Sequence, residues 1–239
     1  MRQYGAMVPR TALVTGGASG IGAALVSLLR EGGCAVEVLD VQTGFDVSDP
    51  DAWERVGAVE LACLNAGVVT GERSIDSLGD EAYRRAAGTN IDGVVFGTRR
   101  LARVAGEGTA IVATASIAGL TALDDDPIYT LTKHAVVGFV RSVAPQLAER
   151  GIRINAVAPG IVATPLLGDA RRGQLEQAGF PLLRPEEVAR VILLAGQSLE
   201  TGQVWCVQPG RPPEPFRFPS MPGPRRADGT PAGPPPRVR

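Results

Sequence analysis

Short apolar runs alternate with longer amphipathic segments along most of the chain. Each run is nearly continuous in apolar residues, which is typical of parallel strands that are covered on both faces. The amphipathic segments between them have the spacing of helices. This alternation predicts an α/β protein with a doubly wound parallel sheet of about seven strands, flanked by helices on both faces, that binds ligands at the carboxyl ends of the strands. The expected strands are TALVTG, AVEVLD, VELACLNAG, GTAIVATAS, IRINAVAPG and GQVWCVQPG, and the expected helices are Ile21–Arg30, Asn90–Ala105, Pro127–Arg150 and Pro185–Gly196.

The alternation stops near Gly210, where the composition changes. Residues 211–239 carry six arginines, two acidic residues and ten of the nineteen prolines. We therefore expect a single domain at residues 1–210, followed by a Pro- and Arg-rich C-terminal extension that forms neither helix nor sheet. The whole chain has a formal charge of −1 and the extension +4 (six minus two), which leaves about −5 (−1 − 4) on the domain.

Two aromatic side chains, Phe216 and Phe218, are unusual in such an extension. A purely disordered segment has little use for aromatic side chains, because it buries nothing. We therefore expect residues 211–224 to pack across a subunit boundary and residues 225–239 to be mobile and dispensable.

Composition and charge argue against several classes of function. No apolar run approaches the roughly 20 residues of a membrane span, and the first ten residues lack the apolar stretch of a secretory signal. A net charge of −1 gives no electrostatic signature of nucleic-acid binding. The three cysteines are an odd number, widely spaced among apolar neighbours. They favour buried thiols in a reducing cytoplasm over disulfides or a metal site.

The first expected strand runs into a glycine-rich turn, TGGASGIG at Thr15–Gly22. Glycines at positions 16, 20 and 22 allow a tight turn, close approach of the backbone to a pyrophosphate, and close packing of the helix on the strand. The free N–H groups at the start of the helix favour phosphates. The alternative is a plain strand–helix connection, but the position of the turn favours nucleotide binding.

The second expected strand ends at Asp40, eighteen residues after Gly22. A carboxylate at this place accepts hydrogen bonds from both adenosine ribose hydroxyls and repels a 2′-phosphate. Val41 follows, so no arginine is in place to bind such a phosphate. The alternative is an aspartate that only forms a turn. Together with the glycine-rich turn, Asp40 favours NAD over NADP.

Lys133 is the only lysine of the chain, and it lies four residues after Tyr129, on the same face of an expected helix. A fixed ammonium group one helical turn away lowers the phenol pKa from its usual value of about 10, which makes the tyrosine a better proton partner. Lysine also offers rotatable donors, whereas the arginine fork is planar. The alternative is a solvated helix face with an incidental lysine. His134 points away from Lys133 and is interpreted as structural.

These motifs, in this order, resemble the classical short-chain dehydrogenases/reductases (SDR), a family with a Rossmann-type fold. The resemblance runs from about Thr11 to Gly210. Each motif is common on its own, whereas their order and spacing are specific. Besides the glycine-rich turn, the resemblance rests on DV at Asp46–Val47, NAG at Asn65–Gly67, NIDG from Asn90, TASIAG around Ser116, YTLTK at Tyr129–Lys133 and PGIVAT at Pro159–Thr164.

The resemblance implies roles for individual residues. Tyr129 would be the acid and base, Ser116 would orient the substrate oxygen, and Asn90 would support a water on a proton path through Lys133. From the residues alone, Ser116 could simply form a turn and Asn90 could cap a helix. Ser116 and Tyr129 would bind the substrate. The implied cofactor-binding residues are Gly16, Ser19, Gly20, Ile21, Gly22, Asp40, Asp46, Val47, Asn65, Ala66, Gly67, Tyr129, Lys133, Pro159, Gly160, Val162 and Thr164.

Two features depart from the usual family pattern. Only 19 residues separate Asp46 from Asn65, so the helix expected at residues 51–56 should be short. Pro145 lies within the long expected helix, and it should kink this helix. In the family, that helix commonly forms a subunit interface.

The predicted function is hydride transfer between NAD(H) and a small secondary alcohol or ketone. The enzyme would be a cytoplasmic homotetramer or homodimer that binds neither nucleic acid nor membranes. Two alternatives stay open: a non-catalytic nucleotide-sensing or scaffold protein with this fold, and a lyase or epimerase that cycles NAD internally. Residues 165–181 should close over the substrate. The acidic run Asp124–Asp126 is either a solvated turn or a border of the active-site mouth, where it would disfavour anionic substrates.

Overall fold

Seven strands form one sheet in the computed structural model, which describes residues 8–233. The order is β2-β1-β3-β4-β5-β6-β7, with six parallel strands and an antiparallel β7 at one edge. Because the chain crosses from β2 over β1 to β3, the switch point of the sheet lies between β1 and β3. The predicted doubly wound α/β fold is confirmed. The strands are β1 (Thr11–Thr15), β2 (Ala35–Leu39), β3 (Leu61–Leu64), β4 (Ala110–Thr114), β5 (Arg153–Pro159), β6 (Val204–Val207) and β7 (Glu214–Pro215).

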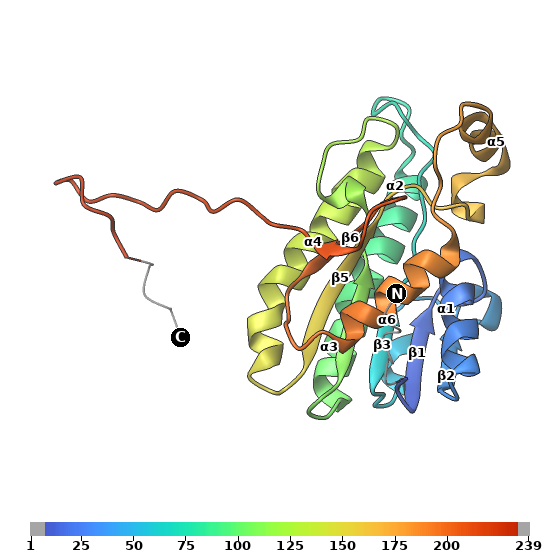
Figure 1. Cartoon of the computed structure of the whole chain (residues 1–239), viewed down its shortest axis with the longest axis horizontal. Helices are drawn as coiled ribbons and strands as arrows, with labels where there is room; N and C mark the ends of the chain where they lie inside the picture. The colour runs from blue at the N-terminus through green and yellow to red at the C-terminus, as the bar shows by residue number, and fades with distance from the viewer. Residues whose placement is uncertain (1–7, 234–239) are drawn as a thin grey trace.

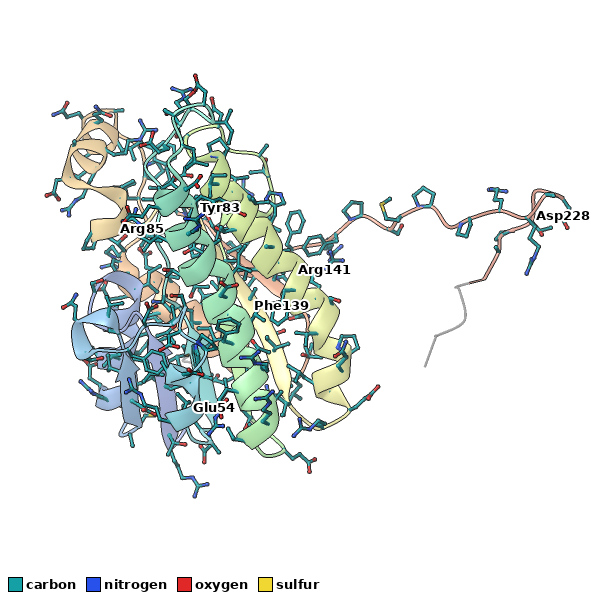
Figure 2. The ribbon with its side chains drawn as sticks, turned by 180° about the vertical axis from the view of Figure 1, so that it is seen from behind. Glu54, Tyr83, Arg85, Phe139, Arg141 and Asp228 are labelled. Carbon is teal, nitrogen blue, oxygen red and sulfur yellow. The ribbon has the colours of Figure 1, made fainter. Side chains whose placement is uncertain are left out.

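Helices cover both faces of the sheet (Figure 1). On one face Leu25 of α1 and Ile192 of α6 share a core with Val14 of β1. On the other face, seen from behind in Figure 2, α3 and α4 pack on Leu13 and its neighbours. α4 remains helical through Pro145. The helices are α1 (Gly20–Glu31), α2 (Asp80–Ala87), α3 (Gly93–Val104), α4 (Pro127–Ala148), α5 (Asp169–Gln177) and α6 (Pro185–Gln197).

The helix expected at residues 90–105 begins earlier in the structure. α2 continues through a π-helical turn at Gly88–Asp92 directly into α3. Asn90 therefore lies inside a continuous helix, and its interpretation as an N-cap is wrong. The apolar pattern missed α2 because Ala86 is the buried residue among its eight. Such π-helical turns are frequent at functional sites.

Two short 3₁₀ turns stand between β2 and β3, at Val41–Thr43 and Ala52–Arg55. The expectation of a short segment near residues 51–56 is therefore confirmed. Trp53 in the second turn is buried, donates its Nε1–H to the Val47 carbonyl (2.9 Å) and meets the Phe45 ring edge-on. This aromatic pair anchors the short connection to the core.

The first part of the C-terminal extension adds a strand to the sheet. β7 pairs antiparallel with β6, and the Phe216 N–H donates to the Val204 carbonyl (2.7 Å). The expectation that the extension forms no sheet is thus wrong at Glu214–Pro215, where an edge position tolerates proline. Phe218 packs against the core, and the Arg141 guanidinium carbon lies 3.6 Å from the centroid of its ring.

Beyond Phe218 the extension leaves the body as an arm, residues 219–233, with Asp228 near its far end (Figures 1 and 2). Near that end, the Arg226 N–H donates to the Thr230 carbonyl (2.8 Å) and closes a turn. Packing across a subunit boundary stays a prediction. Residues 234–239, which belong to the segment expected to be mobile, lie outside the described residues.

No helix within residues 8–233 is long and apolar enough to cross a membrane. In the same part of the chain, no group of three or more His, Cys, Asp or Glu side chains could hold a metal ion. Cys34 and Cys63 are buried free thiols, as expected, and burial raises the pKa of both. Cys206 is also free but only half-buried.

Candidate active site

The glycine-rich turn brings the end of β1 against the end of β3 at the switch point. Gly16 has a φ of +64°, and a Cβ atom there would lie 2.9 Å from the Ala66 Cα. A Cβ on Gly22 would lie 2.0 Å from the Gly16 carbonyl oxygen, so only glycine allows α1 to start this close to the turn. Ser19 precedes α1 without capping it through its side chain. The first N–H groups of α1 therefore have no side-chain cap, which suits an anion.

Asp40 ties the end of β2 to this turn. Its side chain is buried, and its two oxygens accept hydrogen bonds from Ala18 N and Gln42 N, both at 3.0 Å. Asp40 thus forms a turn, as the plainer interpretation expected. Each carboxylate oxygen keeps a further lone pair, which a ribose hydroxyl can use. Val41 is 72% exposed and offers no charge to a 2′-phosphate.

Asn65 connects the ends of three neighbouring strands. Its backbone N–H donates to Thr15 Oγ1 (2.8 Å), its Nδ2 donates to the Thr15 carbonyl (3.2 Å), and its Oδ1 accepts from Thr114 Oγ1 (3.1 Å). The Ala66 N–H donates to the same Thr15 hydroxyl (3.0 Å). These bonds fix the backbone of the NAG motif, whose last residue, Gly67, has no side chain to fill the space beside it.

Three further predicted positions lie around this motif. Val47 is buried and lies close to Thr15 and Ala66. Asp46 is exposed, and its carboxylate accepts from the backbone N–H (2.8 Å) and the hydroxyl (2.7 Å) of Ser48. Ile21 packs against the core on the α1 side of the sheet. The structure thus brings Val47 to the strand ends, whereas Asp46 lies at the surface.

Lys133 lies buried beside Tyr129 on α4. Its side chain is 3% exposed, its Nζ donates to the Thr114 carbonyl (2.8 Å), and Nζ lies 5.5 Å from the centroid of the Tyr129 ring. An ammonium group has three donors, so two remain beyond this bond. A Cβ on Gly67 would lie 3.4 Å from Nζ. The glycine therefore keeps space free beside the ammonium group.

Burial shifts the pKa of both residues. It raises the pKa of the Tyr129 phenol, a rise that the Ser116 hydroxyl opposes and the Asp126 carboxylate increases. It lowers the pKa of Lys133 to about 8. The net shift of the Tyr129 pKa is thus upward, opposite to the expected direction, because burial is its largest cause. The ammonium group donates to the Thr114 carbonyl, and it is itself destabilised by desolvation.

Ser116 comes from the turn that follows β4. Its Oγ accepts from Ala118 N (3.1 Å) and starts a 3₁₀ turn at Ile117–Gly119, so its turn-forming role is real. This turn packs tightly on α4, since a Cβ on Gly119 would lie 2.5 Å from the Lys133 carbonyl oxygen. The close packing brings the Ser116 hydroxyl to the Tyr129 phenol, whose pKa it influences.

Asn90 is fully buried and joins the loop after β3 to α4. Its Oδ1 accepts from Val68 N (2.8 Å), and its Nδ2 donates to the Val68 carbonyl (2.9 Å) and to Thr132 Oγ1 (2.9 Å). Its amide is therefore engaged mainly in holding these segments together. The support of a water, which the family resemblance implied, stays a prediction.

The segment after β5 borders the site from the side of the glycine-rich turn. Val162 forms a bridge with Leu183, and a Cβ on Gly20 would lie 3.1 Å from Thr164 Cγ2. Thr164 precedes a 3₁₀ turn at Pro165–Leu167 without capping it, and its hydroxyl has no hydrogen-bond partner among residues 8–233. That hydroxyl is therefore available to a ligand.

The same segment begins at Pro159, the last residue of β5. Gly160 follows and packs against Gln208, since a Cβ at this glycine would lie 2.4 Å from Gln208 Oε1. The two residues thus place the backbone between β5 and Thr164 at the carboxyl end of the sheet.

Ion pairs join three surface segments near the N-terminus of α4. Asp124 pairs with Arg73 (2.9 Å), and Asp125 pairs with Arg171 of α5 (3.4 Å). All four side chains of these pairs are exposed, so the run is solvated. That it borders the active-site mouth and disfavours anionic substrates stays a prediction. Residues 165–181, expected to close over the substrate, include α5 and meet the acidic run through Arg171.

Four residues that contribute to this site were not predicted from the sequence. Thr15 and Thr114 hold the strand ends, and they give no local signal because they act through their place in the sheet. The Thr132 hydroxyl donates to the Tyr129 carbonyl (2.8 Å), and Asp126 Oδ1 accepts from the Tyr129 N–H (2.8 Å). Asp126 did carry a signal, because an aspartate directly before a helix-starting proline is typical of an N-cap.

Known proteins share the sequence pattern of this chain. A family model described as enoyl-(acyl carrier protein) reductase matches residues 45–210. The cyclohexanol dehydrogenase of Acinetobacter sp. (strain SE19) is 32% identical and aligns with 83% of this chain and 93% of its own length. The cis-4-hydroxycyclohexanecarboxylate dehydrogenase of Sinomonas cyclohexanicum is 34% identical, over 78% of this chain and 89% of its own.

Solved structures share the fold. A short-chain dehydrogenase/reductase from Brucella melitensis, described as a glucose/ribitol dehydrogenase, superposes with a TM-score of 0.76 at 26% identity, covering 84% of this chain and 96% of its own. A small-chain dehydrogenase in complex with NADPH superposes with a TM-score of 0.72 at 24% identity, covering 82% and 95%. At that identity the second likeness concerns the fold alone.

Proposed function

This chain belongs to the short-chain dehydrogenase/reductase family, and we propose that it transfers a hydride between NAD(H) and a secondary alcohol or ketone. It is an oxidoreductase that uses a nicotinamide cofactor; the preference for NAD and the residue roles are our proposal. The observation that carries it is the buried Lys133 ammonium beside Tyr129, with the Ser116 hydroxyl at the same phenol.

The strand ends fit a dinucleotide. The uncapped start of α1 and the close Gly16–Gly22 packing suit a pyrophosphate, and the free lone pairs of Asp40 suit the adenosine ribose. The two remaining donors of Lys133 suit the hydroxyls of the other ribose. The unpartnered Thr164 hydroxyl suits a carboxamide. A nicotinamide bound here would supply the hydride acceptor for the alcohol carbon, or the hydride donor for the ketone carbon.

Tyr129 handles the matching proton. In reduction its hydroxyl donates to the developing alkoxide, and in oxidation its phenolate takes the proton from the alcohol. Because the pKa of Tyr129 is raised, the protonated acid form prevails at neutral pH, which favours reduction there and oxidation at higher pH. Ser116 orients the substrate oxygen from the adjacent turn.

Lys133 and Asn90 assist the proton transfer by Tyr129. The Lys133 ammonium balances the charge of the phenolate, which becomes important only when the proton has left. Asn90 fixes the first turns of α4 through Thr132. Two relatives are named for cyclohexanol and cis-4-hydroxycyclohexanecarboxylate, which supports a ring-borne secondary alcohol as the substrate class.

The test is turnover of a panel of secondary alcohols, including cyclohexanol, with NAD. Tyr129→Phe should abolish NADH formation and leave NADH binding intact, since the ring remains. Tyr83→Phe is the matched control, because Tyr83 lies exposed on α2 (Figure 2) and should behave as wild type. NADH binding without any turnover in wild type would favour a scaffold or nucleotide sensor. Substrate conversion without net NADH would favour a lyase or epimerase.

We further propose a cytoplasmic homotetramer or homodimer. The support for an oligomer is a groove of about 300 Å³ between α3 and α4, lined mainly by apolar atoms of Val95, Ala102, Phe139 and Val143. The Thr98 hydroxyl lies buried at this groove and has no hydrogen-bond partner among residues 8–233. The support for the cytoplasm is the set of free thiols.

A further inference from the structure

The carboxylate of Asp126 holds two segments at once. Its Oδ1 accepts from the N–H of Tyr129 (2.8 Å) and caps α4. Its Oδ2 accepts from Thr70 N (2.7 Å) and Gly71 N (3.1 Å), which belong to the loop after β3. Three N–H donors on one carboxylate make charge-assisted hydrogen bonds, which are about twice as strong as neutral ones.

The same loop is bound to α4 a second time through Asn90. The Asn90 side chain accepts a hydrogen bond from the Val68 N–H, and it donates to the Val68 carbonyl and to Thr132 Oγ1. The Thr132 hydroxyl then donates to the carbonyl of Tyr129 (2.8 Å). The loop at residues 68–71 is therefore held at one end by Asn90 and at the other end by Asp126.

These bonds close a ring around the backbone of Tyr129. Its N–H is held through Asp126, its carbonyl is held through Thr132 and Asn90, and the loop at residues 68–71 joins the two sides. We propose that Asp126 is a positioning residue of the reaction, which fixes the Tyr129 hydroxyl relative to the loop after β3. The inference rests on the proposed function, since it assigns Asp126 to the exchange of a proton at Tyr129.

The geometry separates this role from that of an ordinary helix cap. A cap needs only the bond to Tyr129 N, whereas the two bonds to Thr70 and Gly71 add nothing to α4 itself. Gly71 has a φ of +77°, so the loop takes a conformation that L side chains rarely adopt. The two bonds from Asp126 therefore hold the loop, which glycine allows to take this conformation, and not the helix.

Asp126 also bears on the charge at the phenol. Its carboxylate acts against formation of the phenolate, in the opposite sense to the Lys133 ammonium. Other charged groups around this loop include Glu72, whose carboxylate accepts from Ser77 Oγ (3.1 Å), and Arg85 of α2, which donates to the Val69 carbonyl (3.3 Å). The ion pairs of Asp124 with Arg73 and of Asp125 with Arg171 lie nearby. Removing the Asp126 charge should thus lower the pKa of Tyr129, whereas neutralising an ion-paired neighbour should not.

The experiment compares Asp126→Asn with Asp125→Asn. The first variant keeps the cap, since the amide oxygen can still accept from Tyr129 N, but its NH₂ group cannot accept from Thr70 or Gly71. The second variant removes a charge from the same loop and breaks only the ion pair with Arg171. We expect Asp126→Asn to lower kcat by about tenfold or more, with KM for NADH within about twofold of wild type, because small misplacement of a catalytic group is costly. Asp125→Asn should match wild type.

Two readouts need no turnover. In hydrogen exchange, Asp126→Asn should lose protection at the amides of Thr70 and Gly71 and keep it at Tyr129. By NMR of ¹³Cζ-labelled tyrosine, the pKa of Tyr129 should fall in Asp126→Asn alone. If wild type oxidises no alcohol while both readouts change as described, the proposed function fails and the positioning geometry stands. Unchanged protection at Thr70 and Gly71, or a wild-type kcat in Asp126→Asn of an active enzyme, would overturn the inference.

Discussion

Lys133 should titrate far below an ordinary lysine. Its side chain is 3% exposed, and desolvation lowers its pKa from 10.5 to about 8. No carboxylate pairs with it within the described residues; its one hydrogen-bond acceptor there is the neutral Thr114 carbonyl. The charge is thus kept in the protein without a counter-ion, which is the arrangement that lowers a lysine pKa.

The shift has a predictable effect on stability. A fall from 10.5 to about 8 means that the buried charge destabilises the folded state by about 3 kcal/mol at neutral pH. Between these two pH values the unfolded chain holds more protons than the folded chain, so stability rises with pH across the window. The penalty is fully present below about pH 8, and it is relieved as the pH approaches 10.5.

The perturbation that isolates this effect is Lys133→Met, which keeps an unbranched side chain one atom shorter and removes the charge. The loss of the bond to Thr114 lowers stability at every pH, so the informative quantity is how the difference between the proteins changes with pH. The free energy of unfolding of the variant relative to wild type should fall by about 2 kcal/mol between about pH 7 and about pH 9.5. Urea titrations followed by tryptophan fluorescence measure it.

A direct measurement is possible because Lys133 is the only lysine of the chain. Labelling with ¹³Cε-lysine gives a single side-chain resonance, whose titration reports the pKa without assignment. Tyr129→Phe is the control: the pKa should stay near 8, because burial, rather than the phenol, causes the shift. A resonance that titrates near 10.5, or a stability difference that does not change with pH, would refute the reasoning.

Two further predictions concern the cofactor and the assembly. NAD should be preferred over NADP at least about tenfold in kcat/KM, equivalent to about 1.4 kcal/mol, and Asp40→Ser should narrow this gap; equal efficiencies in wild type would count against the role of Asp40. Val143→Glu places a charge in the apolar groove between α3 and α4, so it should lower the molar mass measured by light scattering, and an unchanged mass would argue that this groove is not a subunit interface.

The strands could be predicted because burial on both faces leaves a strong local pattern. Val14 and Leu13 face opposite cores, and both cores are apolar, so the run reads as continuously hydrophobic. α2 could not be predicted in the same way. It lies at the surface, with Ala86 as its buried residue, and it therefore has almost no apolar face. Its position follows from its continuity with the π-helical turn that contains Asn90.

The composition of the C-terminal extension predicted its extended course but not the strand β7. Ten prolines in residues 211–239 correctly indicate an extended chain, which Figure 1 shows as the arm. The same composition hid β7, because an edge strand needs few of its own N–H donors. The Phe216 N–H supplies one bond to β6, and the Phe218 ring stacks against the guanidinium of Arg141 of α4. The two aromatic residues, rather than the prolines, were the informative signal.

The proximity of Tyr129 and Lys133 could be predicted from their spacing, whereas the pKa shifts of the two side chains could not. A spacing of four residues on a helix places Tyr129 and Lys133 side by side in any fold. Whether the phenol pKa falls or rises depends on how deeply the pair is buried and on what the ammonium group bonds to. Here the Thr114 carbonyl takes Nζ, and Thr114 comes from a strand whose end is known only once the sheet is assembled.

Only the local part of the role of Asp126 can be predicted from neighbouring residues in the sequence. Its bond to Tyr129 spans three residues and follows from the sequence Asp-Pro at a helix start. Its bond to Thr70 spans 56 residues, and the bond from Asn90 to Thr132 spans 42, so both depend on the parallel order of β3 and β4 that brings these segments to one edge. A helix cap can thus be predicted at Asp126 from the chain alone. The contact with the loop after β3 cannot, and it is this contact that makes Asp126 a positioning residue rather than a cap.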